Sequence, residues 1–224
     1  MQNIRSRKSL FTIAFAVVLI LIIVTVAVIL PLLKPSTVYN GEIRQYQGQA
    51  LSSINDFQEA STSINGPQYI DTSTYHLTIT GLVNKTVTYT YQDIINKFTD
   101  YKKVATLQCV EGWSVKILWE GALVADLLKE AGVKSGAVGV IFTAYDGFST
   151  ELPLDYLNSS KIIIAYKINN ITLPADHGYP FQLVAENQAG YKWCKWITQM
   201  EVTNDPNYLG YWESRGYPNN ATIP

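Results

Sequence analysis

The amino-acid sequence predicts a strand-rich α+β domain with mixed sheets, preceded by one transmembrane helix. Residues 10–33 carry no charged side chain, which is typical of a membrane span. After residue 75, strand-like segments outnumber helical ones. They follow one another as hairpins rather than in regular β-α-β alternation, which favours an α+β class over a parallel α/β class. The 224 residues leave room for one domain beyond the span.

The apolar run 10–33 is the first expected element. A helix rises about 1.5 Å per residue, so this run can cross a hydrocarbon core about 30 Å thick. Arg5, Arg7 and Lys8 precede it, whereas only Lys34 follows closely. Because positive residues stay in the cytoplasm, we expect a single-pass cell-membrane protein whose remaining residues lie outside the cytoplasm.

The chain divides into four expected segments. These are a cytoplasmic basic segment at 1–9, an anchor at 10–33, a polar linker or wrapping segment at 34–74, and a folded domain at 75–224. In the linker, Ile54, Phe57 and Tyr69 are the candidates to dock on the domain. Glycosylation sequons begin at Asn84, Asn158, Asn170 and Asn220, which suits an outside location. The net charge is −1 and no basic block follows residue 8, so nucleic acid is not an expected partner.

The folded domain is expected to contain mostly strands and two helices. Strands are predicted within 75–83, 102–109, 138–154 (two strands around an Asp-Gly turn), 161–173 (with an Asn-Asn hairpin), 180–186 and 195–203. A short helix is predicted at 91–98, with Thr90 as its N-cap. A longer helix is predicted at 119–133, where apolar residues recur at helical spacing and Gly132 suits the end. The tail, 204–224, is expected to lie over the surface.

Cys109 has several possible roles when it is considered without the sequence around it. A cysteine on an apolar strand commonly acts as a small buried hydrophobe. A disulfide with Cys194, the other cysteine of the chain, is an alternative outside the cell. A nucleophile would need a base and an orienting residue, and the sequence offers only His76 and His177. A zinc site would need more Cys and His than are present.

Three blocks of sequence narrow these alternatives. They are LQCVEGWSVKILWEG at 107–121, LPADHGYPFQLVAENQAGYKWCKWITQMEV at 173–202 and YWESRGY at 211–217. In this order they resemble the sulfite oxidase family, the oxidoreductase molybdopterin-binding domain. The closer likeness is to the bacterial periplasmic methionine sulfoxide reductase catalytic subunit. The resemblance implies a molybdenum–molybdopterin cofactor whose metal is bound by the Cys109 thiolate, a soft ligand.

The resemblance also implies contacts to the phosphate of the cofactor. His177 and Lys195 match the family's cationic positions, and Lys192 and the backbone amides near Gly190 are further candidates. Solvated strand lysines are the alternative reading of Lys192 and Lys195. Arg215 either reaches the pterin or fastens the tail.

The sequence departs from the family pattern at two places that bear on the cofactor. Gln182 stands where the family usually has an arginine. The segment that embraces the pterin in bacterial relatives is absent, and residues 54–69 are a hypothetical replacement. A metal-free binding or structural module that retains the fold is therefore the competing hypothesis.

The residues around Cys109 favour a neutral substrate. Glu111 lies two residues away, and a carboxylate repels a dianion such as sulfite. We therefore expect oxygen-atom transfer on a sulfoxide or similar S- or N-oxide, with sulfite oxidation as the alternative. Tyr145 and Asp146 are candidates to contact substrate, although Asp146 also suits a plain hairpin turn. The chain has no haem motif and too few cysteines for an iron–sulfur cluster, so a membrane cytochrome or quinone-linked partner is expected to exchange electrons with it.

Overall fold

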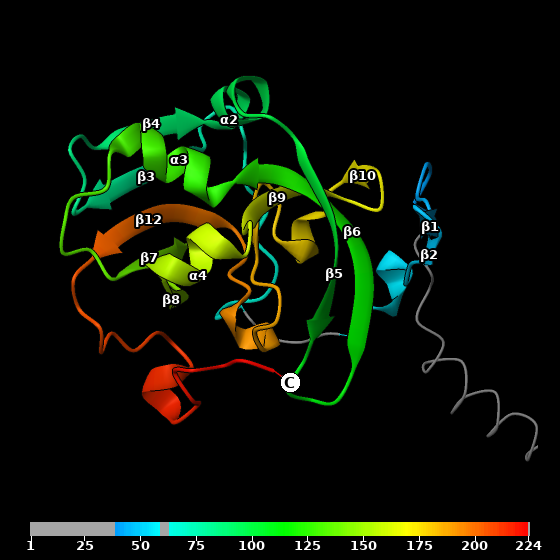
Figure 1. Cartoon of the computed structure of the whole chain (residues 1–224). Coiled ribbons are helices and arrows are strands. Elements are labelled where there is room, and N and C mark those ends of the chain that lie inside the picture. Colours follow the sequence, from blue (N-terminus) through cyan, green and yellow to red (C-terminus); the bar gives the residue numbers. More distant parts are fainter. Residues whose placement is uncertain (1–38, 59–62, 224) are drawn as a thin grey trace, which may run out of the picture. The chain divides into compact units, whose positions relative to one another are not determined.

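Two five-stranded sheets and a two-stranded hairpin form the framework (Figure 1). This computed structural model describes residues 39–58 and 63–223. Within those residues, every helix is too short or too polar to span a bilayer. The predicted anchor at 10–33 lies outside the described residues.

The first sheet is antiparallel and carries Cys109 at its end. Its strands are β10 (Ile171–Thr172), β9 (Ile163–Ile168), β6 (Ser114–Leu123) and β5 (Tyr101–Gln108) in spatial order, and β11 (Gln182–Val184) also pairs with β9. The β5–β6 pairing runs without interruption from Tyr101 opposite Gly121 to Gln108 opposite Ser114. Cys109 is the first residue beyond that register, so it lies in the connection between the two strands.

The second sheet contains both parallel and antiparallel pairs. Its spatial order is β4 (Val87–Thr90), β3 (His76–Gly81), β12 (Ile197–Thr203), β7 (Gly139–Ala144) and β8 (Ser149–Pro153). Strand β12 runs parallel to β3 and antiparallel to β7. The predicted α+β class with mixed sheets is therefore confirmed.

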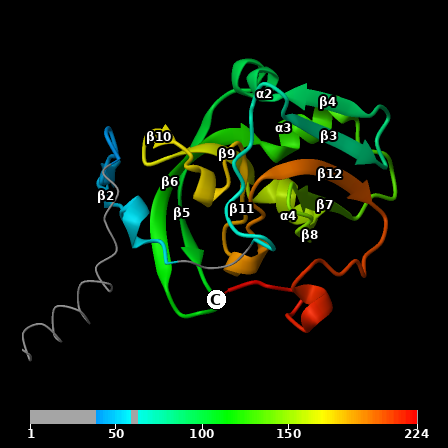
Figure 2. The same cartoon turned by 180° about the vertical axis from the view of Figure 1, so that it is seen from behind.

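Short helices cover one face of the second sheet. From the rear, β3 and β12 lie in front of α3 (Val124–Ala131) and α4 (Leu154–Ser159) (Figure 2). Helix α2 (Tyr91–Lys97) begins with a capping box between Thr90 and Asp93, as Thr90 predicted. Helix α3 ends at Gly132 in the left-handed region, where glycine carries no steric cost.

The predicted helix at 119–133 is wrong in its first third. Residues Trp119 to Leu123 belong to strand β6, and the helix begins at Val124. Leu118 to Ala122 are all buried, so both faces of β6 are covered along this stretch. A strand buried on both faces has no alternation, so it reads as a continuation of the helical pattern that follows.

The described part of the 34–74 segment wraps the domain. It contains β1 (Gln45–Tyr46), β2 (Gln49–Ala50) and the 3₁₀ turn η2 (Ile54–Asp56), and the compact unit begins at Tyr39. Ser52 donates its N–H to the Lys116 carbonyl at 2.8 Å, which ties this segment to β6. Ile54 is buried as expected, whereas Tyr69 is 85% exposed and does not dock.

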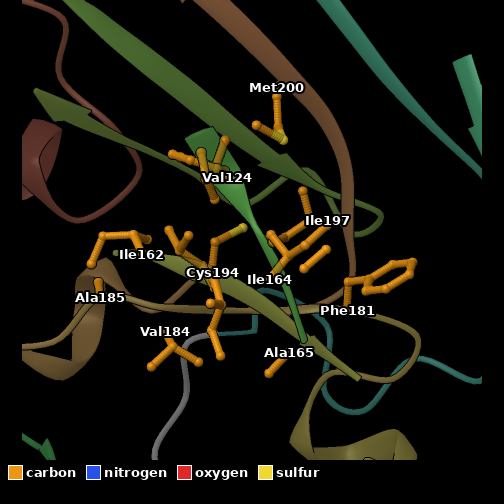
Figure 3. Close-up of a cluster of buried hydrophobic side chains, with 14 of the residues drawn as sticks. Val124, Ile162, Ile164, Ala165, Phe181, Val184, Ala185, Cys194, Ile197 and Met200 are labelled. Carbon is orange, nitrogen blue, oxygen red and sulfur yellow. The ribbon is translucent and has the colours of Figure 1, made fainter. Parts of the chain in front are cut away.

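Cys194 lies in the apolar core, among side chains such as Ile164, Phe181 and Met200 (Figure 3). It is fully buried, while Cys109 is half-buried at the edge of the first sheet. Both are free thiols. The alternative of a Cys109–Cys194 disulfide is therefore wrong, because the two side chains belong to different environments.

We predict that Cys194→Ser lowers the free energy of unfolding by about 1–3 kcal/mol, because a more polar hydroxyl would replace the thiol inside an apolar core. Urea unfolding measures this. Cys109→Ser, at a half-buried turn, should lower it by less. Equal destabilisation by the two changes would contradict the placement of Cys194 in the core.

Candidate functional site

A tight turn presents Cys109 between β5 and β6. The Cys109 N–H donates to the Trp113 carbonyl at 2.9 Å, and the Gly112 N–H donates to the Cys109 carbonyl at 3.1 Å. Gly112 has φ 91, a left-handed conformation that glycine adopts without strain. The turn therefore fixes the Cys109 backbone while leaving its sulfur at the surface of the sheet.

Glu111 lies beside the sulfur. Its Oε2 is 3.9 Å from Cys109 Sγ and accepts the Trp113 indole N–H at 3.4 Å. Burial raises the pKa of the Cys109 thiol, and the Glu111 carboxylate raises it further, while N–H groups of Glu111 and Val110 lower it. Without metal the thiol is therefore protonated at neutral pH. A bound metal would displace that proton.

Two side chains that could bind an anion, His177 and Lys195, meet at the turn η3 (Ala175–His177). The His177 side chain is 12% exposed, and Lys195 donates to the Asp176 carbonyl at 2.9 Å. Burial lowers the pKa of His177 to about 4, Asp176 opposes this, and the Lys195 charge lowers it further. Burial also lowers the pKa of Lys195 to about 8, against the pull of Asp176 and Asp146. An anion placed here would raise both pKa values, so the pair suits a phosphate.

Phe57 lies between His177 and the Cys109 turn. Its ring centroid is 4.5 Å from that of His177 and 6.2 Å from that of Trp113. It follows η2, so the wrapping segment supplies part of the site. This is the region that the sequence suggested as a replacement for the pterin-embracing segment.

Gly190 lies directly against the Cys109 backbone. It opens the 3₁₀ turn η4 (Gly190–Lys192), and its neighbour Ala189 forms a parallel bridge with Gln108. A Cβ on Gly190 would lie 3.1 Å from the Gln108 carbonyl oxygen and 3.4 Å from Cys109 Cα. Gly190 therefore belongs to the site through its close approach to Cys109.

Lys192 has a different role from the predicted one. Its ammonium is 2.6 Å from Glu213 Oε1, and it donates to Asn219 Oδ1 at 3.1 Å and to the Glu151 carbonyl at 3.2 Å. Lysine has three N–H donors, and these three acceptors engage them. This corrects the predicted phosphate contact, since the charge is buried and already neutralised.

Arg215 fastens the tail. Its guanidinium stacks 3.6 Å from the Tyr211 ring centroid and donates to the Tyr211 carbonyl at 2.6 Å. Of the two alternatives for Arg215, these contacts favour tail fastening over the pterin.

Tyr145 and Asp146 lie on the hairpin between β7 and β8. Asp146 accepts the Ile64 N–H at 2.7 Å and the Phe148 N–H at 3.1 Å, so its carboxylate holds backbone. Tyr145 is 63% exposed, and its N–H donates to the Trp196 carbonyl at 2.9 Å. Trp196 follows Lys195, so the hairpin tip lies next to the Lys195 side of the site.

Two further residues belong to the site: Trp196, which had no signal in the sequence, and Gln182, which the sequence marked only as a departure from the family arginine. Trp196 is buried with φ 50, a conformation that is rare for aromatic residues, and its indole donates to the Ala175 carbonyl at 2.7 Å. It thereby holds η3 in place. Gln182 is buried beside Gly178, and its Oε1 has no hydrogen-bond partner among the described residues. A buried amide without a partner suits a polar ligand such as a pterin ring.

Comparison with known proteins agrees with a site built for a molybdenum cofactor. Residues 64–212 match the family described as the oxidoreductase molybdopterin binding domain. An uncharacterized oxidoreductase, YuiH, of Bacillus subtilis is 33% identical over 67% of this chain and 76% of its own length. A putative protein-methionine-sulfoxide reductase subunit, YedZ1, of Azospira oryzae is 30% identical over 66% of this chain and 56% of its own length.

More distant relatives extend the family. Rat mitochondrial sulfite oxidase is 25% identical over 66% of this chain, but the match covers only 32% of the oxidase. The crystal structure of sulfane dehydrogenase SoxCD from Paracoccus pantotrophus shares the fold, with a TM-score of 0.60 and 23% identity over 62% of this chain and 41% of that one.

The chain belongs to the oxidoreductase molybdopterin-binding domain family, of which sulfite oxidase is a member. It is an oxidoreductase, and its cofactor is molybdenum–molybdopterin. The residues present fit that group: a half-buried thiol for the metal, the half-buried His177 and Lys195 side chains for the phosphate, and the Gln182 amide oxygen that lacks a partner among the described residues. This favours an enzyme over the metal-free module.

We predict that His177 makes the cofactor-free protein less stable in acid. Between about pH 6.5 and 4 the unfolded chain binds a proton that folded His177 does not, so stability falls as pH falls through this window. The loss should reach about 3 kcal/mol at pH 4. Urea unfolding should show a smaller fall in His177→Gln, with His76→Gln as the control. Identical pH profiles for parent and His177→Gln would contradict the burial of His177.

Proposed function

We propose that this chain is a membrane-anchored oxidoreductase that transfers an oxygen atom to or from a neutral sulfoxide or a related S- or N-oxide. The observation that carries the proposal is the Glu111 carboxylate 3.9 Å from Cys109 Sγ. It places a negative charge where the substrate would meet the metal.

Each of the site residues has its own proposed role. Cys109 holds the metal, and His177 and Lys195 hold the cofactor phosphate. When bound, molybdenum of this type exchanges one oxygen atom and two electrons with the substrate. Trp113 orients Glu111 by its indole N–H, and Tyr145, which is exposed at the hairpin tip, is available to substrate.

The placement of arginines supports a neutral substrate over sulfite. Guanidinium groups suit dianions because they offer paired donors. Two arginines lie within the described residues, and both are engaged elsewhere. Arg44 donates to the Leu51 carbonyl at 3.2 Å, and Arg215 stacks on Tyr211.

The names of the relatives fit the same proposal without deciding it. The Azospira relative is a putative protein-methionine-sulfoxide reductase subunit, while others are sulfite oxidases and nitrate reductases. The direction of reaction follows from the redox partner, for which we propose a membrane cytochrome or a quinone-linked protein.

We predict that Cys109→Ser abolishes turnover and alters the Mo(V) paramagnetic signal, because a soft thiolate ligand is replaced by a hard oxygen. Electron paramagnetic resonance and sulfoxide reduction assays measure this. Cys194→Ser is the matched control and should keep both the signal and the activity. An active Cys109→Ser enzyme would contradict the assignment of Cys109 as the metal ligand.

We predict that Glu111→Gln raises kcat/KM for the sulfite dianion roughly 300-fold relative to a neutral sulfoxide. Removing one charge about 10 Å from a second charge changes their interaction by about 1.7 kcal/mol per unit charge at an effective dielectric of about 20. Steady-state assays on both substrates give the ratio. Efficient sulfite oxidation by the parent, with an unchanged ratio in Glu111→Gln, would show that the substrate is anionic.

We predict that the domain beyond residue 38 lies outside the cytoplasm, because the cations at Arg5, Arg7 and Lys8 favour a cytoplasmic amino terminus. Protease added to intact cells or spheroplasts should cleave it, while a cytoplasmic marker protein stays intact. A domain protected until the membrane is lysed would overturn both the topology and the proposed partner.

A further inference from the structure

The buried ion pair between Lys192 and Glu213 is the most completely enclosed charge pair in the described part of the chain. The two side chains are 1% and 0% exposed, and the nitrogen–oxygen distance is 2.6 Å. Thr150 donates its hydroxyl to the same Glu213 oxygen at 2.8 Å. Desolvation offsets much of the attraction in such a pair, so its main effect is to impose one geometry.

The pair joins two segments that are far apart in sequence. Lys192 ends η4, and Glu213 begins the 3₁₀ turn η5 (Glu213–Arg215) in the tail. The tail then returns to the lower end of β5 (Figure 1). There the Ala189 N–H donates to the Ala221 carbonyl at 2.9 Å, and the Ile223 N–H donates to the Asn187 carbonyl at 3.0 Å. The tail therefore holds the Asn187–Lys192 loop at both of its ends.

That loop is the neighbour of the Cys109 backbone. Gly190 approaches Gln108 and Cys109 so closely that an added Cβ would lie 3.1 Å from the Gln108 carbonyl oxygen. On its other side, Cys109 is held by the turn to Trp113. A shift of the loop would therefore reach Cys109 through direct backbone contact.

We propose that the Lys192–Glu213 pair is a positioning clasp, which holds Gly190 against Cys109 and so sets the direction in which the sulfur meets the metal. The inference rests on the proposed role of Cys109 as metal ligand. Glu213 lies one residue beyond the matched region 64–212, so the clasp draws on the tail outside that match.

The test compares Glu213→Gln with Glu120→Gln. Glu120 is also buried, with 5% of its side chain exposed, and pairs with Lys102 at 2.9 Å and Lys167 at 2.7 Å. It lies opposite Lys102, six residues along β6 from Ser114, which is about 20 Å from the Cys109 end of the hairpin. Both changes remove one charge from a buried ion pair, but only Glu213→Gln loosens the loop beside Cys109.

Hydrogen–deuterium exchange on the cofactor-free protein provides a readout that does not depend on activity. Glu213→Gln should speed exchange at Cys109 and Gly112 about tenfold, while Glu120→Gln leaves these amides unchanged. In loaded protein, Glu213→Gln should lower molybdenum affinity roughly tenfold and broaden the Mo(V) signal. Unchanged exchange at Cys109 in Glu213→Gln would overturn the clasp, whereas an unaltered Mo(V) signal in Cys109→Ser would overturn the ligand assignment instead.

Gly190→Ala keeps the test decisive if Glu213→Gln fails to fold. The added methyl group meets the Gln108 carbonyl oxygen at 3.1 Å, so the chain must give by a few tenths of an ångström while the ion pair stays intact. A shifted Mo(V) signal with normal thermal stability is expected. A signal identical to that of the parent would show that contact with Gly190 does not position Cys109, and would overturn the proposal.

Discussion

The site depends on the turn that closes the β5–β6 hairpin. The Cys109 N–H donates to the Trp113 carbonyl, and Gly112 supplies the left-handed conformation that the turn requires. These contacts bring the Cys109 sulfur and the Glu111 carboxylate together at the end of a long, uninterrupted strand pair.

Other parts of the domain supply the side chains for the cofactor phosphate and an aromatic contact. The phosphate-binding side chains are His177 on η3 and Lys195, and Trp196, the residue after Lys195, holds η3 by donating its indole N–H to the Ala175 carbonyl. Burial lowers the pKa values of both side chains, and a bound phosphate would raise them again. The wrapping segment adds Phe57, which contacts both halves of the site. Binding of an anionic cofactor is therefore favoured by electrostatics that the apo protein already contains.

Much of this could be predicted from sequence. The mixed sheets followed from alternation and hairpin signals, and Thr90 and Gly132 marked helix ends correctly. The sequence did not predict strand β6, because this strand is buried on both faces. It did not predict the role of Lys192 either, because the acceptors of Lys192 include Glu213 and Asn219, which lie more than twenty residues away. Local pattern cannot reveal a buried lysine's distant partner, since a lone lysine is usually exposed.

The central claim is that the Cys109 thiolate is bound to molybdenum. X-ray absorption at the molybdenum K-edge, on loaded parent protein and on Cys109→Ala, counts the sulfur atoms around the metal most directly. The account predicts one fewer molybdenum–sulfur contact in Cys109→Ala, with the contacts from the cofactor's own sulfurs retained. An equal sulfur count in the two proteins would contradict it.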